Sequence, residues 1–211
     1  MPGIRPPWPR LIGLTGLAGS GKSTVAEVFS RMGARVIEAD RMGHSLLYKN
    51  SPCYDRLVKT FGPAILTASG DISRSKLGKV VFSDSRQLAS LNRIVHPRLV
   101  SEITRRARLL MRRKPFRPVV IDAALIVPWG MDRRVDRLVV VEAPRPARLA
   151  RLMGRGLTRE RVRRIFQAQP RPADLRRKAD LVIANRGSVK ELRRRAERAW
   201  RELFPATAAG R

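Results

Sequence analysis

Cysteine, aromatic side chains and acidic residues are all scarce in this 211-residue sequence. Its one cysteine, Cys53, can form no intrachain disulfide, which excludes a disulfide-held secreted scaffold and leaves the thiol as a small apolar filler. Aromatic residues make up only 5% of the chain while 43% is hydrophobic, so the core is expected to be aliphatic. No apolar run approaches the roughly 20 residues of a transmembrane helix, and no signal-peptide pattern is found. We therefore expect a cytoplasmic protein.

The scarcity of acid leaves a formal net charge of +28, from 45 Lys and Arg against 17 Asp and Glu. Such an excess would suit any polyanion, including nucleic acid, an anionic membrane or a phosphorylated substrate. Most of the basic residues are arginines scattered through helical patterns, which favours solvated faces. The basic C-terminal third holds only Phe166, Trp200 and Phe204, too few aromatics for interleaved base stacking. A nucleic-acid partner is therefore not expected despite the charge, and neither is a membrane partner.

Short β-branched runs alternate with longer amphipathic stretches, a pattern typical of parallel strands joined by crossover helices. Runs that are apolar from end to end fit strands that are covered on both faces. Strands are expected at residues 11–14, 35–38, 119–122, 138–142 and 181–184. Helices are expected at 23–32, 86–113 with a break at Pro97, 146–153, 158–169 and 188–203, with Thr158 as an N-cap and Ser188 with Glu191 as a capping box. We predict a three-layer α/β fold around a five-stranded parallel sheet.

Residues 16–23 match the phosphate-binding pattern G-x-x-x-x-G-K-[ST], between an expected strand and an expected helix. The glycines let the backbone curl so that successive N–H groups point at phosphate oxygens, and the helix adds its positive N-terminal end. Lys22 would reach the β- and γ-phosphates of ATP, and the Ser23 hydroxyl would hold Mg²⁺. The sequence thus predicts a nucleoside triphosphate site formed by Gly16, Gly19, Ser20, Gly21, Lys22, Ser23 and Thr24.

The P-loop alone does not separate a kinase from a GTPase, a motor or a helicase. A chain of 211 residues leaves little room for the added machinery of a helicase or a ring ATPase. The N-K-x-D guanine motif is missing, because Asn50, Asn92 and Asn185 are followed by Ser, Arg and Arg. A small-molecule kinase is therefore the leading class.

Two carboxylates follow expected strands, at the edge where open α/β sheets bind ligands. Asp40 could orient or deprotonate an acceptor hydroxyl, or it could cap the next helix. Glu38, two residues earlier, is the weaker candidate for the same role. Asp122 could bind Mg²⁺ through water, or it could be bonded to a neighbouring turn.

These motifs resemble, in order and spacing, those of the dephospho-CoA kinase family. The resemblance covers about residues 11–203. Two departures stand out: Glu38 replaces the first acid of D-A-D, and Pro128 stands where many relatives have an acidic residue. The shared segments are L-T-G-x-x-G-S-G-K-S-T at 14–24, D-A-D at 38–40, G-x-x-x-R at 70–74, L-N-x-x-x-H-P at 91–97 and, after Gln169, A-D-x-V-I-x-N-x-G at 179–187.

The resemblance implies a helical substrate-binding insertion at about 41–115 and an Arg-rich lid at about 148–179, inside one P-loop kinase domain at 11–204. Residues 1–10 and 205–211 are expected to be loose ends. The implied roles are a catalytic base for Asp40, phosphate contact for Arg151 or Arg155, and an adenine-side loop for Asn185 and Gly187. Arg74 and His96 would contact the substrate, although His96 could be structural and each lid arginine a solvated side chain.

The implied reaction moves the γ-phosphoryl group of ATP, with Mg²⁺, to the ribose 3′-hydroxyl of dephospho-CoA and gives CoA and ADP. One rival is another small-acceptor kinase, for nucleoside monophosphates or sugar acids. A rival from another class is a basic P-loop protein that binds nucleic acid. We expect a monomer or a small homo-oligomer.

Overall fold

The computed structural model describes residues 9–113 and 117–205. The expected loose ends therefore lie outside the described residues, apart from Pro9, Arg10 and Pro205. The chain divides into two compact units, one made of 1–37 with 107–211 and the other of 38–106. The second unit overlaps the range expected for the insertion.

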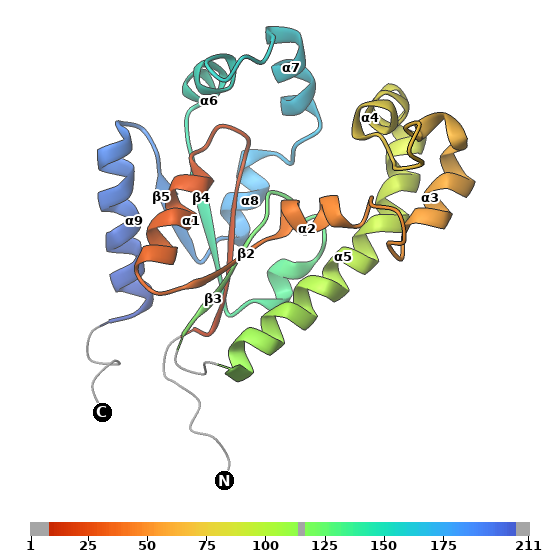
Figure 1. The fold of residues 1–211 in the computed structure, drawn as a ribbon. Coiled ribbons are helices and arrows are strands. Elements are labelled where there is room, and N and C mark those ends of the chain that lie inside the picture. Colours follow the sequence, from red (N-terminus) through yellow and green to blue (C-terminus); the bar gives the residue numbers. More distant parts are fainter. Residues whose placement is uncertain (1–8, 114–116, 206–211) are drawn as a thin grey trace. The chain divides into compact units, whose positions relative to one another are not determined.

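The first unit contains the five-stranded parallel sheet, in the order β2-β3-β1-β4-β5 (Figure 1). The central strand β1 pairs Leu14 with Asp122 of β3 and Gly16 with Val141 of β4, so these strands end at one edge of the sheet. Strands β3 and β4 are buried over almost their whole length, as expected for strands covered on both faces. The predicted α/β fold is confirmed. The strands are β1 (Leu11–Gly16), β2 (Arg35–Glu38), β3 (Val119–Asp122), β4 (Arg137–Glu142) and β5 (Leu181–Ala184).

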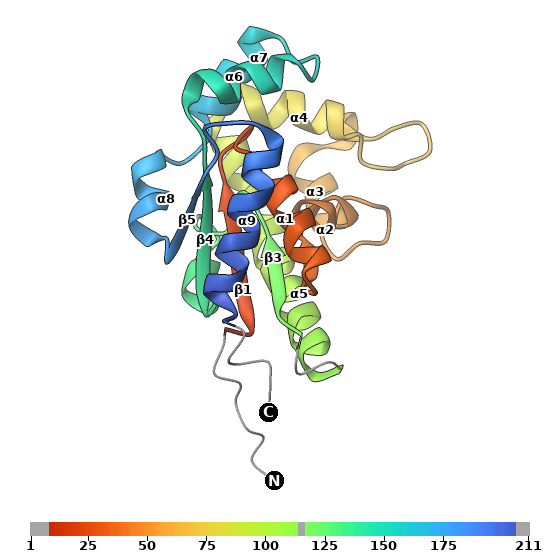
Figure 2. The same cartoon turned by 90° about the vertical axis from the view of Figure 1, so that its left-hand side faces the viewer.

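Two helices pack against each other over the sheet, α1 (Lys22–Arg31) and α9 (Val189–Leu203) (Figures 1 and 2). Their shared core is mostly aliphatic, and Phe29 meets Trp200 with 5.3 Å between ring centroids. The expected capping box begins α9, with both the Ser188 and the Glu191 side chains accepting backbone N–H groups.

Three shorter helices lie between β4 and β5: α6 (Arg145–Met153), α7 (Arg159–Gln167) and α8 (Pro172–Lys178). The Thr158 side chain accepts the Arg161 N–H at 3.3 Å, which confirms the predicted N-cap of α7. The sequence pattern did not predict α8, a short helix that begins at Pro172, where a missing N–H costs nothing. The range expected for the lid runs from within α6 to just past α8.

The second unit is helical, and the sequence pattern predicted only its last helix. Its elements are α2 (Ala39–Ser45), α3 (Tyr54–Phe61), the 3-10 helix η1 (Pro63–Ile65), α4 (Arg74–Ser83) and most of α5 (Ser85–Arg113). The predicted break at Pro97 is wrong, because α5 continues through it. Proline removes one helical hydrogen bond, but the buried side chains of Ile94, Leu99 and Ile103 hold the helix on both sides.

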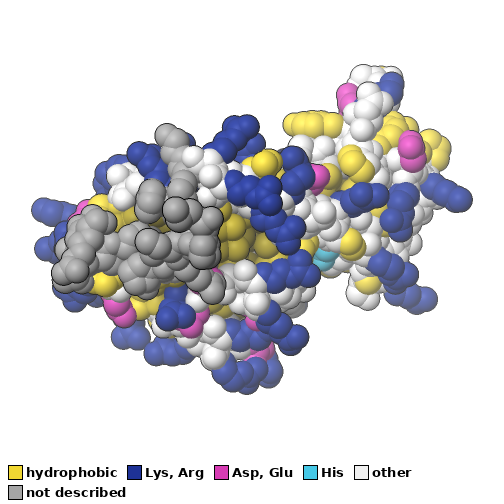
Figure 3. Space-filling view, turned by 90° about the horizontal axis from the view of Figure 1, so that it is seen from below, with side chains coloured by type: hydrophobic (Ala, Val, Ile, Leu, Met, Phe, Trp, Pro, Cys, Tyr) yellow, Lys and Arg dark blue, Asp and Glu magenta, His cyan; other side chains and the backbone are white. Residues whose placement is uncertain are grey.

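On the face seen in Figure 3, basic side chains lie at many separate places, and a few acidic side chains lie among them. Several arginines pair locally, as Arg105 does with Glu102 at 2.8 Å and Arg164 with Glu160 at 3.3 Å. Among the helices described, none has the length and apolar character needed to span a membrane.

Candidate active site

The P-loop joins the carboxyl end of β1 to α1, which is the strand–loop–helix context that the motif requires. Gly19 and Gly21 have φ angles of 78° and 99°, in the left-handed region that favours glycine. A Cβ atom at Gly21 would lie 2.5 Å from Nδ2 of Asn185, so space also excludes a side chain there. The loop is therefore built for close approach of its backbone to a ligand.

Lys22 and Asp122 contact each other at the carboxyl edge of the sheet. The Lys22 ammonium donates to Oδ1 of Asp122, and the two side chains are only 15% and 11% exposed. The pairing of Leu14 with Asp122 brings the ends of β1 and β3 together and so explains the contact. The cation expected on the phosphates and the carboxylate expected near Mg²⁺ thus share one small region.

Asn185, which follows β5, is buried and holds the P-loop in place. Its Nδ2 donates to the carbonyl of Ser20 at 2.7 Å, and its Oδ1 accepts from Arg151 at 3.1 Å. Arg151 also donates to the carbonyl of Gly19 at 3.1 Å. Asn185 and Arg151, which the sequence predicted for different roles, are therefore joined to the loop in one network. A Cβ atom on Gly187 would clash with Oε2 of Glu191, so the α9 capping box requires glycine there.

Asp40, in the second unit, is the second residue of α2 and is exposed. The N-cap of α2 is Glu38, and no side chain caps the helix, so the alternative of Asp40 as a cap is wrong. Glu38 instead pairs with Arg41 at 3.5 Å on the surface. The Asp40 carboxylate has no hydrogen-bond partner within residues 9–113 and 117–205, which leaves its oxygens available to a ligand.

A family model described as dephospho-CoA kinase matches residues 10–191. The chain belongs to the dephospho-CoA kinase family. The dephospho-CoA kinase of Aquifex aeolicus is 38% identical over 192 residues, covering 91% of this chain and 96% of that protein. The dephospho-CoA kinase of Corynebacterium efficiens is 40% identical over 195 residues, covering 92% and 96%. A crystal structure from Thermus thermophilus has a TM-score of 0.76 at 30% identity and covers 93% of this chain and 99% of its own.

Membership in the dephospho-CoA kinase family confirms the predicted class, an ATP-dependent kinase with a P-loop fold. It supports the main prediction over both rivals, the other small-acceptor kinases and a basic nucleic-acid-binding protein.

The remaining candidate residues of this dephospho-CoA kinase family member lie apart along the chain. Arg155 is exposed in the turn after α6, and its guanidinium has no partner in the described part of the molecule. Arg74 is the first residue of α4 and is also exposed. His96 is half-buried in α5, and burial lowers its pKa, so the imidazole is neutral at pH 7. Each role stays a prediction.

Mg²⁺ would meet a modest set of ligands in this structure. Ser23 offers an exposed hydroxyl at the start of α1, and Asp122 offers a carboxylate at the end of β3. No group of three or more His, Cys, Asp or Glu side chains that could hold a metal occurs in the described ranges. This set fits Mg²⁺, which is commonly bound by one or two protein oxygens together with substrate phosphates and water.

A pocket of about 400 Å³ lies beside the P-loop at the carboxyl ends of β4 and β5. Its lining includes Leu17, Pro144 and Leu175, together with the charged residues Arg148, Arg176 and Arg186. Arg148 was not among the residues predicted from the sequence; its place one turn before Arg151 on α6 was the only available signal.

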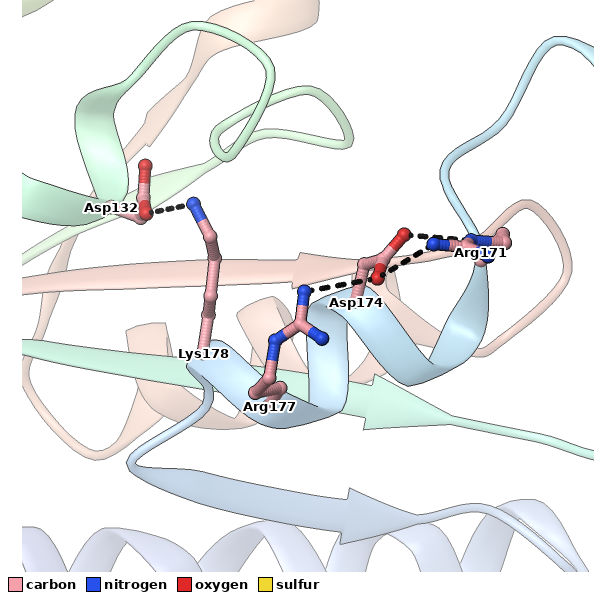
Figure 4. Close-up of polar contacts among 5 residues, drawn as sticks. All are labelled: Asp132, Arg171, Asp174, Arg177 and Lys178. Atoms are coloured by element: carbon pink, nitrogen blue, oxygen red, sulfur yellow. Dashed lines mark hydrogen bonds and ion pairs between the residues drawn. The ribbon is translucent and has the colours of Figure 1, made fainter.

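Ion pairs fix α8, which forms one wall of this pocket, to the sheet side of the unit. Arg176 donates to Glu142 of β4 at 2.9 Å. Lys178 donates to Asp132 of the 3-10 helix η2 (Met131–Arg134), as Figure 4 shows. Two of the five residues drawn there, Arg171 and Arg177, instead pair with Asp174 within or beside α8.

Proposed function

We propose that this protein transfers the γ-phosphoryl group of ATP to the ribose 3′-hydroxyl of dephospho-CoA, which gives CoA and ADP. The observation that carries the proposal is the family match over residues 10–191, combined with the Lys22–Asp122 contact at the end of β1. ATP is the phosphoryl donor implied by the family, and dephospho-CoA is the acceptor that the relatives' names give.

The P-loop would receive the ATP phosphates. Its backbone N–H groups and the Lys22 ammonium offset the phosphate charge, so Lys22 exchanges the Asp122 carboxylate for phosphate oxygens when ATP binds. Ser23 would hold Mg²⁺ directly and Asp122 through water; when bound, the ion supplies further charge neutralisation at the β- and γ-phosphates. Asn185 and Arg151 bond to the carbonyls of Ser20 and Gly19, and would so keep the P-loop in the conformation that points its backbone N–H groups at the phosphates.

Asp40 would accept the proton of the 3′-hydroxyl. The hydroxyl oxygen would form the new bond to the γ-phosphorus while the bond between that phosphorus and the ADP oxygen breaks. An exposed carboxylate with no intramolecular partner in the described chain is suited to this role, since its oxygens are open to the substrate. Arg155 has an unengaged guanidinium among the described residues and is the better candidate for contact with the transferring phosphoryl group. Arg151, already bonded to Gly19 and Asn185, would act mainly by holding the loop.

The acceptor would be bound in part by the helical residues 38–106. Arg74 supplies a charge for the acceptor's diphosphate, and neutral His96 supplies a hydrogen-bonding imidazole. Asn185 and Gly187 belong to the loop after β5, where the adenine of ATP would lie. We further propose that turnover requires Mg²⁺ and that the protein is a monomer or a small homo-oligomer.

The test is the rate of ADP release under saturating Mg-ATP, with dephospho-CoA, AMP and gluconate as separate acceptors. We expect kcat/KM for dephospho-CoA to exceed that of the other two by at least about a hundredfold. A reaction without acceptor measures ATP hydrolysis and is subtracted. Mass spectrometry and ³¹P NMR of the product should show one added phosphate as a 3′-monoester. Comparable rates with AMP or gluconate would overturn the proposal.

A further inference from the structure

Arginines stand at the amino ends of four neighbouring strands, at the edge of the sheet opposite the P-loop (Figure 1). Backbone hydrogen bonds between these strand starts fix their order. The N–H group of Arg35 donates to the carbonyl of Pro118 at 2.9 Å. The N–H group of Val119 donates to the carbonyl of Arg10 at 2.8 Å. We call the four residues the arginine row: Arg35 in β2, Arg117 before β3, Arg10 before β1 and Arg137 in β4.

Asp136 and Asp180 lie at the same edge, and both bind backbone N–H groups. Asp136, directly before β4, donates its own N–H to the carbonyl of Leu11 at 2.7 Å. Its Oδ2 accepts the N–H groups of Arg10 and Leu11 at 2.8 and 2.9 Å. Just before β5, Oδ2 of Asp180 accepts the N–H of Leu138 at 2.6 Å. These acids therefore join the strand starts to one another, and the arginine row ends at β4.

The side chains of the arginine row form no ion pair in the described part of the chain. Arg35 and Arg117 are exposed there. Arg137 is also exposed and donates to a backbone carbonyl at 3.0 Å. Arg10 is half-buried: one terminal nitrogen donates to the carbonyl of Met111 at 2.8 Å, while its buried Nε has no partner among the described residues. The row thus concentrates positive charge that no described ion pair offsets.

The spacing of the arginine row suits a chain of phosphates. Neighbouring strands lie about 4.8 Å apart, so four successive strand starts span about 14 Å. One strand of a nucleic acid duplex carries a phosphate per about 3.4 Å of its axis, which places about four phosphates along that length. A guanidinium can bind two oxygens of one phosphate at once. We propose that the arginine row is a nucleic-acid-binding surface, which contacts one strand of a duplex through its phosphates and reads no base sequence.

Phosphate contact alone removes the objection that aromatic residues are scarce. Base stacking serves single strands, whereas binding to a duplex backbone needs only charge and hydrogen-bond donors. An anionic membrane surface fits the row less well, because interfacial binding needs an apolar face beside the charges. Met32 and Leu109, the apolar side chains close in sequence to Arg35 and Met111, are only 39% and 37% exposed. The inference does not depend on the proposed reaction, since the row and the P-loop lie at opposite ends of the strands.

Fluorescence anisotropy of a labelled duplex of about 20 base pairs tests the proposal on the full chain, with the association constant measured between about 50 and 200 mM salt. Each phosphate contact contributes about −0.9 to the slope of the logarithm of this constant against that of the salt concentration. About four contacts therefore predict a slope of about −3 to −4 and a loss of affinity of about a hundredfold over this range. Two duplexes of unrelated sequence should bind equally within about threefold, because no base is read.

Arg35→Gln together with Arg117→Gln removes two exposed cations of the row and should reduce the magnitude of the slope by about 2. Arg10→Gln should reduce it by about 1. If half-buried Arg10 proves necessary for folding, the double variant decides alone. The matched control, Lys190→Gln with Arg194→Gln, removes the same charge from exposed positions near the start of α9 and should keep the wild-type slope. The row variants should also keep the wild-type rate of ADP release.

Three outcomes contradict the proposal. The first is absence of duplex binding at about 50 mM salt, or equal slopes in the row variants and the control, since binding would then reflect net charge alone. The second is displacement of the duplex by saturating Mg-ATP, which would place it in the nucleotide site. The third is cosedimentation with vesicles of phosphatidylcholine and phosphatidylglycerol that only the row variants lose, with an unchanged duplex slope; the row would then bind membranes. A protein that binds the duplex as expected but lacks kinase activity would contradict the proposed function alone.

Discussion

Lys178 donates from Nζ to Oδ2 of Asp132 at 2.7 Å and so joins the last residue of α8 to η2 (Figure 4). The Asp132 side chain is 8% exposed, that of Lys178 is 37% exposed, and Oδ1 of Asp132 is buried without a partner in the described chain. The carboxylate thus depends on one lysine for compensation of its charge.

Replacing Lys178 with Ala should lower the free energy of unfolding by about 1–3 kcal/mol, because the Asp132 carboxylate stays buried and loses its cation. The value lies below that of a fully buried pair because Lys178 is partly exposed. Adding Asp132→Asn to the Lys178→Ala variant should restore part of the lost free energy of unfolding, because the buried charge is then removed. Urea denaturation measures both variants.

Arg177→Ala is the matched control. The Arg177 side chain is 75% exposed and that of its partner Asp174 is 28% exposed, so the pair should contribute less than about 1 kcal/mol to the free energy of unfolding. Equal effects of Lys178→Ala and Arg177→Ala would contradict the argument from burial.

Lys22→Ala should lower kcat by at least about a hundredfold, since an ammonium that neutralises transferring phosphates is lost. It also removes a hydrogen-bonding partner of Asp122, so thermal unfolding is measured beside the rate to show that the variant is folded at the assay temperature. Near-normal turnover under saturating Mg-ATP would mean that the nucleotide site is wrongly assigned.

Asp40→Asn keeps the size of the side chain but removes its ability to accept a proton. General-base catalysis typically contributes about 10²–10⁴ in rate, so kcat should fall in that range with little change in ATP affinity. Stability should hardly change, because Asp40 is exposed and does not cap α2.

Asp55→Asn, an exposed acid in the first turn of α3, serves as the control and should leave kcat unchanged. A loss of less than about tenfold for Asp40→Asn would leave the base unidentified.

Asn185→Ala should weaken ATP binding by about tenfold, because the carbonyl of buried Ser20 loses its donor and Arg151 loses one acceptor. The effect should appear in the KM for ATP more than in kcat, since Asn185 holds the loop and does not meet the reacting atoms. An unchanged affinity for ATP would show that the loop keeps its conformation without this network.

Nucleotide binding should order only part of the expected lid. Arg176 and Lys178 tie α8 to Glu142 and Asp132, so amides of 172–178 should show similar hydrogen exchange with and without an ATP analogue. Residues 154–167 lack such ties to the described chain and should become more protected. Equal changes in both segments would contradict the anchoring of α8.

Local sequence patterns account for the features that were predicted correctly. The P-loop, the capping box at Ser188 and the N-cap at Thr158 depend on residues within a few positions of each other, and apolar runs mark the buried strands. The short helices α2, α3, α4 and α8 were not predicted; α2 and α8 have only seven residues, which is too few for a clear helical period. The predicted break at Pro97 failed because packing on both sides outweighed one lost hydrogen bond.

The sequence by itself determined the family, the individual strands and the phosphate-binding loop of this protein, since motifs and apolar runs are encoded by neighbouring residues; the order of the strands in the sheet came from the tertiary structure. Only the tertiary structure decided which side chains meet that loop: Lys22 and Asp122 are 100 positions apart, and Asn185 and Ser20 are 165 apart. It also decided that Arg148 is buried while Arg155 is exposed, although both are arginines in one basic segment. Burial and long-range contacts arise when distant elements pack, and sequence spacing carries no measure of them.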